Sequence, residues 1–429
     1  MRSTALLAII FLGAAWALAH PSFGVLLWTW VSIMNPHRYT WVTSSFPVAA
    51  IVGGATLAGL FLSKDKKNFF LSAPSAALML FMLWITVTYP FSVFLEGSAD
   101  MLIKVLKIDL MILVALVLLH SKSHIISLVW VLVLSIGLYG VKGGIFTLMT
   151  GGGYHVVGPP DSFIGGNNEV ALALIMVIPL MYFLRDQARK TWLRHTWLVA
   201  MALTSAAVIG SQSRGALLGI VAMMALLWLR TRQKLFMGVF IVAGGILLFA
   251  FMPESWHERM DTITSYQADS SAMGRINAWR MAWNLASQNI FGGGFDIYNS
   301  TMFTLYAPDP LDLHAAHSIY FQVLGEHGFI GLALFLAIWG LTWHWAGWLR
   351  NNAKTNPETE WAAVLGGMCQ VSLTGYAVGG AFLGLAYFDL PYNMMVLVVL
   401  TRRWVEAHQK KEKLEPAKSG MPFTQKSEI

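Results

Sequence analysis

The chain has 429 residues, of which 56% are hydrophobic and 12% are charged, and its formal net charge is +7. Soluble globular proteins carry about 25% charged residues, so this composition excludes an ordinary soluble domain and favours an all-α, polytopic membrane protein. The positive charge lies mostly in short loops and in the C-terminal tail, which indicates membrane topology rather than nucleic-acid binding. The single cysteine, Cys369, lies in an apolar run, so there is no disulfide framework and no cysteine metal site.

Long apolar segments follow one another along the chain. The first, 4–33, follows Arg2 and is broken at His20-Pro21, and we interpret it as an uncleaved membrane segment. Counted as one kinked crossing, it brings the total to about twelve transmembrane helices, whereas separate crossings at 4–19 and 22–34 bring it to about thirteen. The other segments are 46–62, 74–93, 101–119, 125–147, 166–184, 195–212, 213–230, 234–252, 327–348, 361–385 and 388–402.

Basic residues concentrate in alternate loops, which all fall on one side of the predicted membrane. The Lys and Arg distribution identifies that side as the cytoplasm and also places the C-terminus there. The tight turn at 211–215 and the long stretch 253–316 then face the periplasm. The basic loops are 63–67, 120–124, 185–195, 230–234, 350–354 and the tail from Arg402.

The stretch 253–316 is the one long polar region between membrane segments. Apolar residues recur in it at three- and four-residue spacing, which predicts an amphipathic helix on the membrane surface, ended by the glycines 292–294. The predicted organisation is nine membrane helices in 1–252, a periplasmic loop in 253–316, three membrane helices in 317–403, and a disordered cytoplasmic tail in 404–429. The residues of the apolar face are Ile276, Trp279, Trp283, Ala286 and Ile290.

Arg214 lies in the segment SQSRG, at the turn between two apolar segments. A guanidinium at membrane depth is costly unless an anion meets it, so Arg214 is a candidate for binding an anionic substrate. The alternative is an interfacial arginine that reaches lipid phosphate. Basic residues otherwise concentrate on the opposite side, and the position therefore favours the functional interpretation.

Arg275 and Arg280 lie in GRINAWR on the predicted amphipathic helix, five residues apart and so on different faces. Arg275 is expected at the helix start, where free N–H groups also favour anions. Headgroup contact explains Arg280 more simply. Arg214 and Arg275 together predict a clamp for a pyrophosphate.

His314 and His317 lie in the segment HAAHS, before a long apolar segment. A neutral imidazole is the usual base near pH 7, and His317 is predicted on the same side as two arginines, so we interpret it as a catalytic base. The alternative is a histidine that caps or packs against a helix, and for His314 both interpretations stay open. A metal site of these histidines with Asp309 and Asp312 is disfavoured, because the spacing matches no common site.

Further polar residues lie within or beside apolar segments. Lys142 is predicted in the outer half of its helix, and Asn168 and Glu169 are predicted at the outer end of theirs, where they can line the same cavity as the arginines. A structural network of hydrogen bonds between helices is an equally good explanation. The remaining members of this group are Lys104, Lys107, Asp109 and Asn167.

Three motifs together resemble a known family. His317-Ser318, followed after nine residues by Gly328-Phe329-Ile330-Gly331, is similar to the pattern H-[N/S/Q]-x9-G-x2-G of O-antigen ligases, which are related to O-antigen polymerases and bacterial protein O-oligosaccharyltransferases. SQSRG and GRINAW are similar to the two arginine motifs of that group. Ser318 stands where many members have Asn, and both residues can cap a helix. The segments 35–41, 139–148 and 158–168 resemble a subgroup found beside exosortase systems and described as O-glycosylation ligases.

The resemblance implies a GT-C-like membrane glycosyltransferase with no cofactor and no metal. Its donor would be a glycan on undecaprenyl pyrophosphate, and its acceptor lipid A–core, at the periplasmic face of the bacterial inner membrane. His317 would act as the base of an inverting transfer, and Arg214 and Arg275 would stabilise the leaving pyrophosphate. The candidate binding residues for pyrophosphate or glycan are Arg214, Arg275, Arg280, His314, Lys142, Asn168 and Tyr320.

Two alternatives remain at this stage. The first keeps the same chemistry with another acceptor, either a protein hydroxyl or a growing polysaccharide chain. The second is a transporter for the lipid-linked glycan that makes no bond. A transporter predicts charged residues through both halves of the membrane, whereas here the polar residues cluster on the predicted periplasmic side.

Overall fold

The computed structural model describes residues 2–39, 46–68, 71–231, 233–261 and 270–419. This part of the chain is helical and contains no strand, as the composition predicted. Among the described residues, six helices are long and apolar enough to cross a membrane, and three further apolar helices are shorter. The total of twelve or thirteen crossings therefore stays a prediction.

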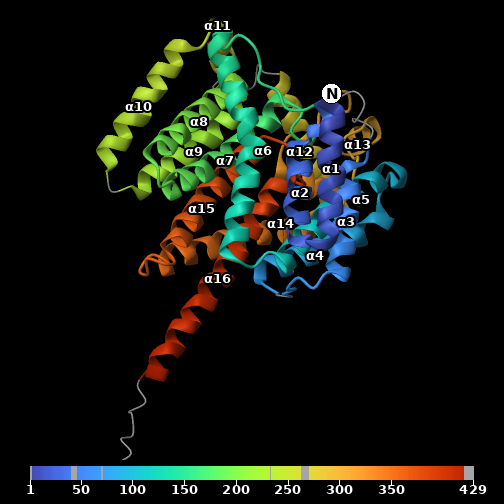
Figure 1. Ribbon diagram of the computed structural model, residues 1–429. Coiled ribbons are helices and arrows are strands. Elements are labelled where there is room, and N and C mark those ends of the chain that lie inside the picture. The colour runs from blue at the N-terminus through green and yellow to red at the C-terminus, as the bar shows by residue number, and fades with distance from the viewer. Residues whose placement is uncertain (1, 40–45, 69–70, 232, 262–269, 420–429) are drawn as a thin grey trace, which may run out of the picture.

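The helices follow the predicted apolar segments closely (Figure 1). The first half contains α1 (Arg2–Ala19), α2 (Pro21–Met34), η1 (Pro36–Tyr39), α3 (Val48–Leu62), α4 (Ala73–Thr88), η2 (Tyr89–Phe91), α5 (Leu95–Leu118), α6 (Lys122–Met149) and α7 (Asn167–Gln187). The second half contains α8 (Thr191–Gly210), α9 (Arg214–Arg230), α10 (Lys234–Phe251), α11 (Glu254–Asp261), α12 (Ser270–Gln288), α13 (Ser300–Tyr306), α14 (Ile319–Asn352), α15 (Glu360–Gly380) and α16 (Asp389–Ser419).

The segment 4–33 is two helices folded back on each other, so its interpretation as one kinked crossing is wrong. The side chain of Leu27 lies against Gly13, and Gly24 lies against Ala17, which makes α1 and α2 an antiparallel pair. Proline has no N–H and cannot continue a preceding helix, so Pro21 starts a new one. The alternative with two separate segments fits this fold.

Helix α7 lies at the centre of the bundle. Nearly every residue of its middle part is buried, and it contacts α6, α8, α9 and α15. Between α9 and α15, the backbones approach closely at Gly219, Gly375 and Gly379, as small residues allow between membrane helices. The packing of α7 therefore holds in place the backbone at its start, which carries Glu169.

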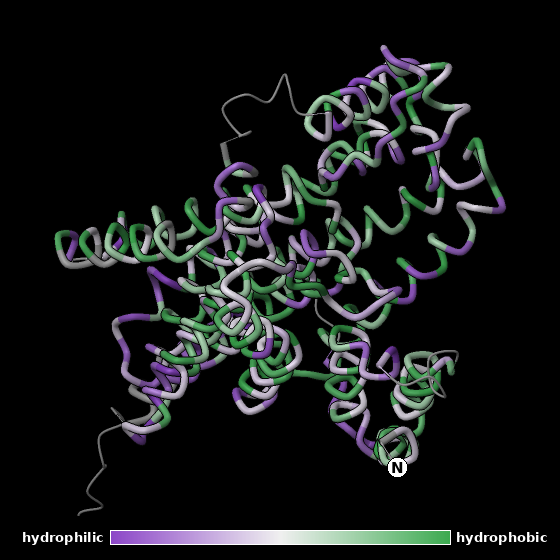
Figure 2. The backbone as a smooth tube through the Cα atoms, turned by 90° about the horizontal axis from the view of Figure 1, so that it is seen from above, coloured by the Kyte–Doolittle hydropathy of each residue, from purple (hydrophilic) through white to green (hydrophobic). Residues whose placement is uncertain are grey.

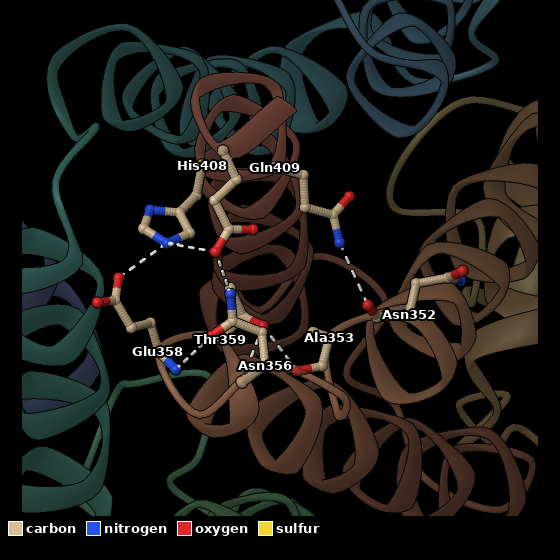
Figure 3. A network of polar contacts seen from close by, with 8 residues as sticks. Asn352, Ala353, Asn356, Glu358, Thr359, His408 and Gln409 are labelled. Atoms are coloured by element: carbon tan, nitrogen blue, oxygen red, sulfur yellow. Dashed lines mark hydrogen bonds and ion pairs between the residues drawn. The ribbon is translucent and has the colours of Figure 1, made fainter. Parts of the chain in front are cut away.

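One end of the bundle gathers the basic loops, and we call it the basic end. Figure 3 shows α16 joined there to the loop between α14 and α15. His408 Nε2 lies 2.8 Å from Glu358 Oε2, and Gln409 Nε2 donates to the Asn352 carbonyl oxygen at 3.2 Å. The side chain of Asn356 also donates to the carboxylate of Glu412.

Two further basic loops lie at the basic end. Lys122, at the start of α6, lies over the Trp361 ring at 4.9 Å. Arg403 reaches the carbonyl oxygen of Asn68 at 3.5 Å, next to the loop 63–67. Since α14 runs from Ile319 to Asn352, a length of about 50 Å, the residues before Ile319 lie at the opposite end, which we call the site end.

The C-terminal tail, predicted to be disordered from residue 404, is helical through Ser419 in α16. This helix projects beyond the rest of the bundle (Figure 1). It is held where it leaves the bundle, because the rings of Trp404 and Trp361 pack at 5.2 Å and Trp404 stacks on His408. Residues 420–429 of the predicted tail lie outside the described residues.

Large apolar side chains are exposed on the outward faces of the helices, among them Phe61, Leu83 and Val221. Figure 2 shows hydrophobic residues along most of the helices at the periphery of the molecule. Soluble proteins rarely expose apolar surface on this scale, whereas a helix in a bilayer exposes it to lipid. The chain is therefore a membrane protein.

Candidate functional site

His317 forms the turn that leads into α14. Its φ angle is +41°, in the left-handed region that residues other than glycine rarely adopt. Its Nδ1 atom lies 3.8 Å from Oε1 of Glu169, and the two side chains are 35% and 18% exposed. This separation is longer than a hydrogen bond, so the two groups face each other without being bonded.

Ser318 occupies the N-cap position of α14, but its side chain does not cap the helix. Its carbonyl oxygen accepts from the Gln322 N–H at 2.9 Å, while its buried hydroxyl has no hydrogen-bond partner among the described residues. The prediction of a helix start at 317–318 is confirmed. The expectation that the Ser318 hydroxyl acts as the cap is wrong, because backbone geometry alone begins the helix here.

Helix α12 holds the loop that precedes His317. Trp279 Nε1 donates to the Ala316 carbonyl oxygen at 2.7 Å, and the Trp279 ring stacks on Phe321 with 4.9 Å between centroids. Asn277 Nδ2 donates to the carbonyl oxygens of Asp309 at 2.7 Å and Asp312 at 3.0 Å. These contacts fix both sides of the His317 turn to one helix.

His314 packs directly on α12 at Gly274. A Cβ atom on Gly274 would lie 2.2 Å from the imidazole, so only glycine leaves room for this ring. The Nδ1 atom of His314 lies 2.9 Å from Oδ1 of Asp312. The ring is therefore held between α12 and the carboxylate of its own loop.

Arg275 is close enough to His317 to act on its protonation. Burial is the main cause that lowers the pKa of His317, followed by the positive charge of Arg275 and then by His314. Arg275 also acts electrostatically on Glu169, so the three side chains share one site. An imidazole with a lowered pKa is neutral at pH 7, which is the form that accepts a proton.

The predicted helix start at Arg275 is wrong. Helix α12 begins at Ser270, so Arg275 lies in the second turn, beyond the four free N–H groups. The predicted position of the apolar face on the membrane surface stays a prediction: Trp283 and Ile290 are exposed, whereas the face that packs on the rest of the protein carries Gly274, Ala278, Met281 and Leu285. The small residues of that face allow the loop of residues 309–316 to approach the helix.

Arg214 is the first residue of α9, after a tight turn. Gln212 has a φ of +54°, and its side chain donates to the Gly152 carbonyl oxygen at 2.9 Å. Asn167 Nδ2 donates to the Ser211 carbonyl oxygen at 2.8 Å. The predicted turn at 211–215 is thus tied to the start of α7, two residues before Glu169.

The loop between α15 and α16 connects the two halves of the site. Gly215, next to Arg214, packs against Phe382 and Leu383, and Gly384 lies beside the backbone of His317. Arg214 and His317 therefore lie on either side of one short loop. The structure brings the three principal candidates, Arg214, Arg275 and His317, to the site end together with Glu169.

Gly328 breaks α14 near this end. Its φ and ψ are +68° and −173°, which are accessible essentially to glycine alone, and a Cβ there would lie 2.3 Å from the Ile290 carbonyl oxygen. The carbonyl oxygen of His327, left free by the break, accepts from Trp84 Nε1 at 2.8 Å. The first glycine of the G-x2-G pattern therefore makes a kink rather than a smooth start of the helix.

Four other candidates stand differently. Lys142 is exposed on α6, three residues after Tyr139, whose hydroxyl donates to the Met34 carbonyl oxygen. The Tyr320 hydroxyl donates to the Ala377 carbonyl oxygen at 2.7 Å and joins α14 to α15. Arg280 is exposed on α12, and Asn168 is half-buried beside Glu169.

Among the described residues, no three His, Cys, Asp or Glu side chains gather in a way that could hold a metal ion. The side chains of the disfavoured metal alternative have other neighbours: the Asp309 N–H donates to Asn277, and Asp312 contacts His314. The absence of a metal from the mechanism stays a proposal.

Sequence reasoning undervalued three residues of this site. The sequence predicts Glu169 only as one of several polar residues beside apolar segments, although its Oε1 atom lies 3.8 Å from Nδ1 of His317. Trp279 was assigned to an apolar face and Asn277 to none, although both anchor the loop before His317. Trp279 and Asn277 both lie in the GRINAW motif, which is the sequence signal for them. The spacing puts Gly274 and Asn277 on one face of the helix, and Arg275 and Trp279 on another.

Residues 199–336 match the family model described as O-antigen ligase. This match supports the resemblance to the O-antigen ligase superfamily. The O-antigen ligase match contains Arg214, Arg275, His317 and the Gly328 kink, but not Glu169. Residues 1–189 match a family of unknown function, DUF5935, which supplies Glu169. No curated protein matches the chain.

Proposed function

We propose that this protein is a member of the O-antigen ligase superfamily and transfers a glycan en bloc from undecaprenyl pyrophosphate to an acceptor hydroxyl. Lipid A–core of lipopolysaccharide is the proposed acceptor, and the periplasmic face of the inner membrane is the proposed place of reaction. The observation that carries the proposal is the shared site of His317, Glu169 and Arg275 at the edge of the O-antigen ligase match.

In the proposed reaction, neutral His317 takes the proton of the acceptor hydroxyl. The hydroxyl oxygen attacks the anomeric carbon, and the bond from that carbon to the pyrophosphate oxygen breaks, with inversion. The pyrophosphate leaves with the electron pair, and the guanidinium groups of Arg214 and Arg275 stabilise its charge, so that no metal is needed. Arg280, His314 and Asn168 are proposed to contact the glycan or the pyrophosphate.

Glu169 is proposed to position the imidazole. Its carboxylate faces Nδ1 of His317, which leaves Nε2 to accept the proton. Once His317 is protonated, the carboxylate would stabilise the imidazolium, as the buried aspartate does in a serine-protease triad. We assign no role in this mechanism to Lys142, which is exposed on α6, or to Tyr320, whose hydroxyl is bonded to α15.

The test is a transfer assay with purified protein, lipid-linked oligosaccharide and separate acceptors, with and without EDTA. We expect product on lipid A–core, unchanged by EDTA. Product on peptide alone identifies a protein O-oligosaccharyltransferase, and elongated glycan without either acceptor identifies a polymerase. Loss of product in EDTA contradicts the metal-independent mechanism.

His317→Ala is expected to lower the rate by about 10²- to 10⁴-fold, the usual contribution of a general base. His344→Ala is the matched control, because His344 is exposed on the same helix α14 near the basic end. A transporter that makes no bond would move lipid-linked glycan across a vesicle membrane equally well in wild type and His317→Ala. That result would replace the proposed transferase.

A further inference from the structure

A cavity of about 740 Å³ lies between α2, α3 and α5, in the half of the chain that matches the family of unknown function. Neither His317 nor Arg275 lines it. Residues from two sequence segments, 35–38 and 161–163, contribute to its wall, and the proposed reaction uses neither. The apolar part of the lining includes Trp28, Val48, Leu57, Ile103, Met111 and Phe163.

Three positively charged side chains line the same cavity: Arg38, Lys104 and Lys107. Two carboxylates, Asp100 and Asp161, also line it, and both residues are exposed. Exposed carboxylates are well hydrated and offset the charges of Arg38, Lys104 and Lys107 only in part. His37 adds no charge at pH 7, because burial, followed by the charge of Arg38, lowers its pKa.

Arg38 is only partly satisfied by the protein. Its Nη1 atom lies 3.8 Å from Oδ2 of Asp161, whose side chain is 82% exposed. Its Nε atom is buried and has no hydrogen-bond partner among the described residues. A buried N–H donor without an acceptor is costly, and an anion in the cavity would satisfy it.

Lys104 reaches the cavity from α5. Its Nζ atom lies 3.8 Å from the centroid of the Phe163 ring, and it forms no ion pair with the described residues. The nearest acidic influence comes from the buried carboxylate of Asp389, which accepts a hydrogen bond from Ser32. Because Lys104 lines the cavity and is exposed, an anion in the cavity can reach its ammonium group.

The apolar wall continues onto surface that a lipid chain would cover. Phe46, Ile103 and Leu110 line the cavity and are 42%, 48% and 41% exposed. A soluble anion would use the charges and leave this surface uncovered. A lipid with a phosphate headgroup satisfies both parts, since its headgroup meets the cations and its chain lies on the apolar side chains.

We propose that this cavity is a binding site for a membrane lipid with an anionic phosphate headgroup, held by Arg38, Lys104 and Lys107. The site is separate from the His317 site and does not rest on the proposed function. It borders the segment that leads to Glu169, because Phe163 lies in its wall. The Phe163 ring also packs on the ring of Phe388, between α15 and α16, with 6.2 Å between centroids.

The test is a titration of the full-length protein in neutral detergent with short-chain phosphatidic acid, followed by native mass spectrometry. Phosphatidylcholine of the same chain length and inorganic phosphate are titrated in parallel. We expect saturable binding of phosphatidic acid, weaker binding of phosphatidylcholine, and no displacement by a tenfold excess of inorganic phosphate. Equal binding of the two lipids, or displacement by inorganic phosphate, would overturn the assignment to an anionic lipid.

Arg38→Gln and Lys104→Gln are each expected to weaken the binding of phosphatidic acid by about fivefold, the usual effect of one cation near a lipid headgroup. Lys104→Arg keeps the charge and should keep the affinity, which separates loss of charge from misfolding. Lys66→Gln is the matched control, because Lys66 is exposed in a loop at the basic end. Wild-type affinity in both neutralised variants would also overturn the proposal.

Discussion

His317 is held in a backbone conformation that a histidine does not adopt by preference. A left-handed φ in a residue other than glycine costs about 1–3 kcal/mol and persists only where neighbouring contacts enforce it. Here the bond from Trp279 to Ala316 and the start of α14 at Ser318 enforce it on both sides. This backbone conformation orients the imidazole toward Glu169, so the relative position of the two side chains is fixed without a bound substrate.

Arg275→Gln is expected to shift the pH dependence of kcat/KM. In the proposed mechanism neutral His317 is active, so activity is lost as the pH falls through the pKa of this residue. The charge of Arg275 lowers that pKa below its usual value of 6.5, so removing the charge raises the pKa, and the loss begins at higher pH. The measurement is the acidic limb of the pH profile of glycan transfer.

Arg280→Gln is the control for this shift, because Arg280 lies on the same helix but is exposed. Its acidic limb should coincide with that of the wild type. If the limb does not move in Arg275→Gln either, Arg275 does not act on His317, and its role is confined to binding.

At the scale of secondary-structure elements, the glycines 292–294 are joined to α14 next to its kink. The N–H groups of Gly293 and Gly294 donate to the carbonyl oxygens of Gly325 and Glu326, both at 2.9 Å. These bonds fasten the segment after α12 to the first part of α14. The position of His317 thus depends on α12 twice, directly through Trp279 and indirectly through this kink.

Gly328→Ala is expected to destabilise the protein by about 3 kcal/mol, because the new methyl group forces both a forbidden backbone conformation and a clash with the Ile290 carbonyl oxygen. The midpoint of thermal unfolding in detergent measures the effect. Gly340→Ala is the control in the same helix, since a Cβ at Gly340 meets no atom within 4 Å. Equal midpoints for the two variants would contradict the role of the kink.

At the scale of the whole molecule, the two ends of the bundle differ in chemistry. Loops 63–67 and 120–124, the loop between α14 and α15, and the first part of the tail gather at the basic end. Arg214, Arg275 and His317 lie at the site end. The topology predicted from Lys and Arg places the basic end in the cytoplasm and the site end in the periplasm, where a lipid-linked glycan would be presented.

Cysteine labelling tests this orientation. The native Cys369 is buried and should give little background. Leu311, which is 91% exposed at the site end, and Lys66 at the basic end are each replaced by cysteine. A membrane-impermeant thiol reagent is expected to label position 311 in intact spheroplasts and position 66 only after lysis. The reverse pattern would contradict the predicted topology and show that the site end faces the cytoplasm.

The sequence by itself determined the class of protein and the order and approximate bounds of the helices, and it supplied three principal candidate residues whose roles stay proposals. These depend on local properties: the length of an apolar segment, the position of a proline or glycine, and the charge of a loop. The family followed from motifs around Arg214, Arg275 and His317, and the match of residues 199–336 confirms it.

Only the tertiary structure decided which residues surround His317. Glu169 and His317 belong to α7 and to the turn before α14, far apart in the chain, and no local pattern encodes their 3.8 Å separation. The face of α12 that packs on the loop before His317 carries small residues, and apolar periodicity gives no signal for such a face. The left-handed turn at His317 likewise results from contacts that α12 makes after the chain has folded.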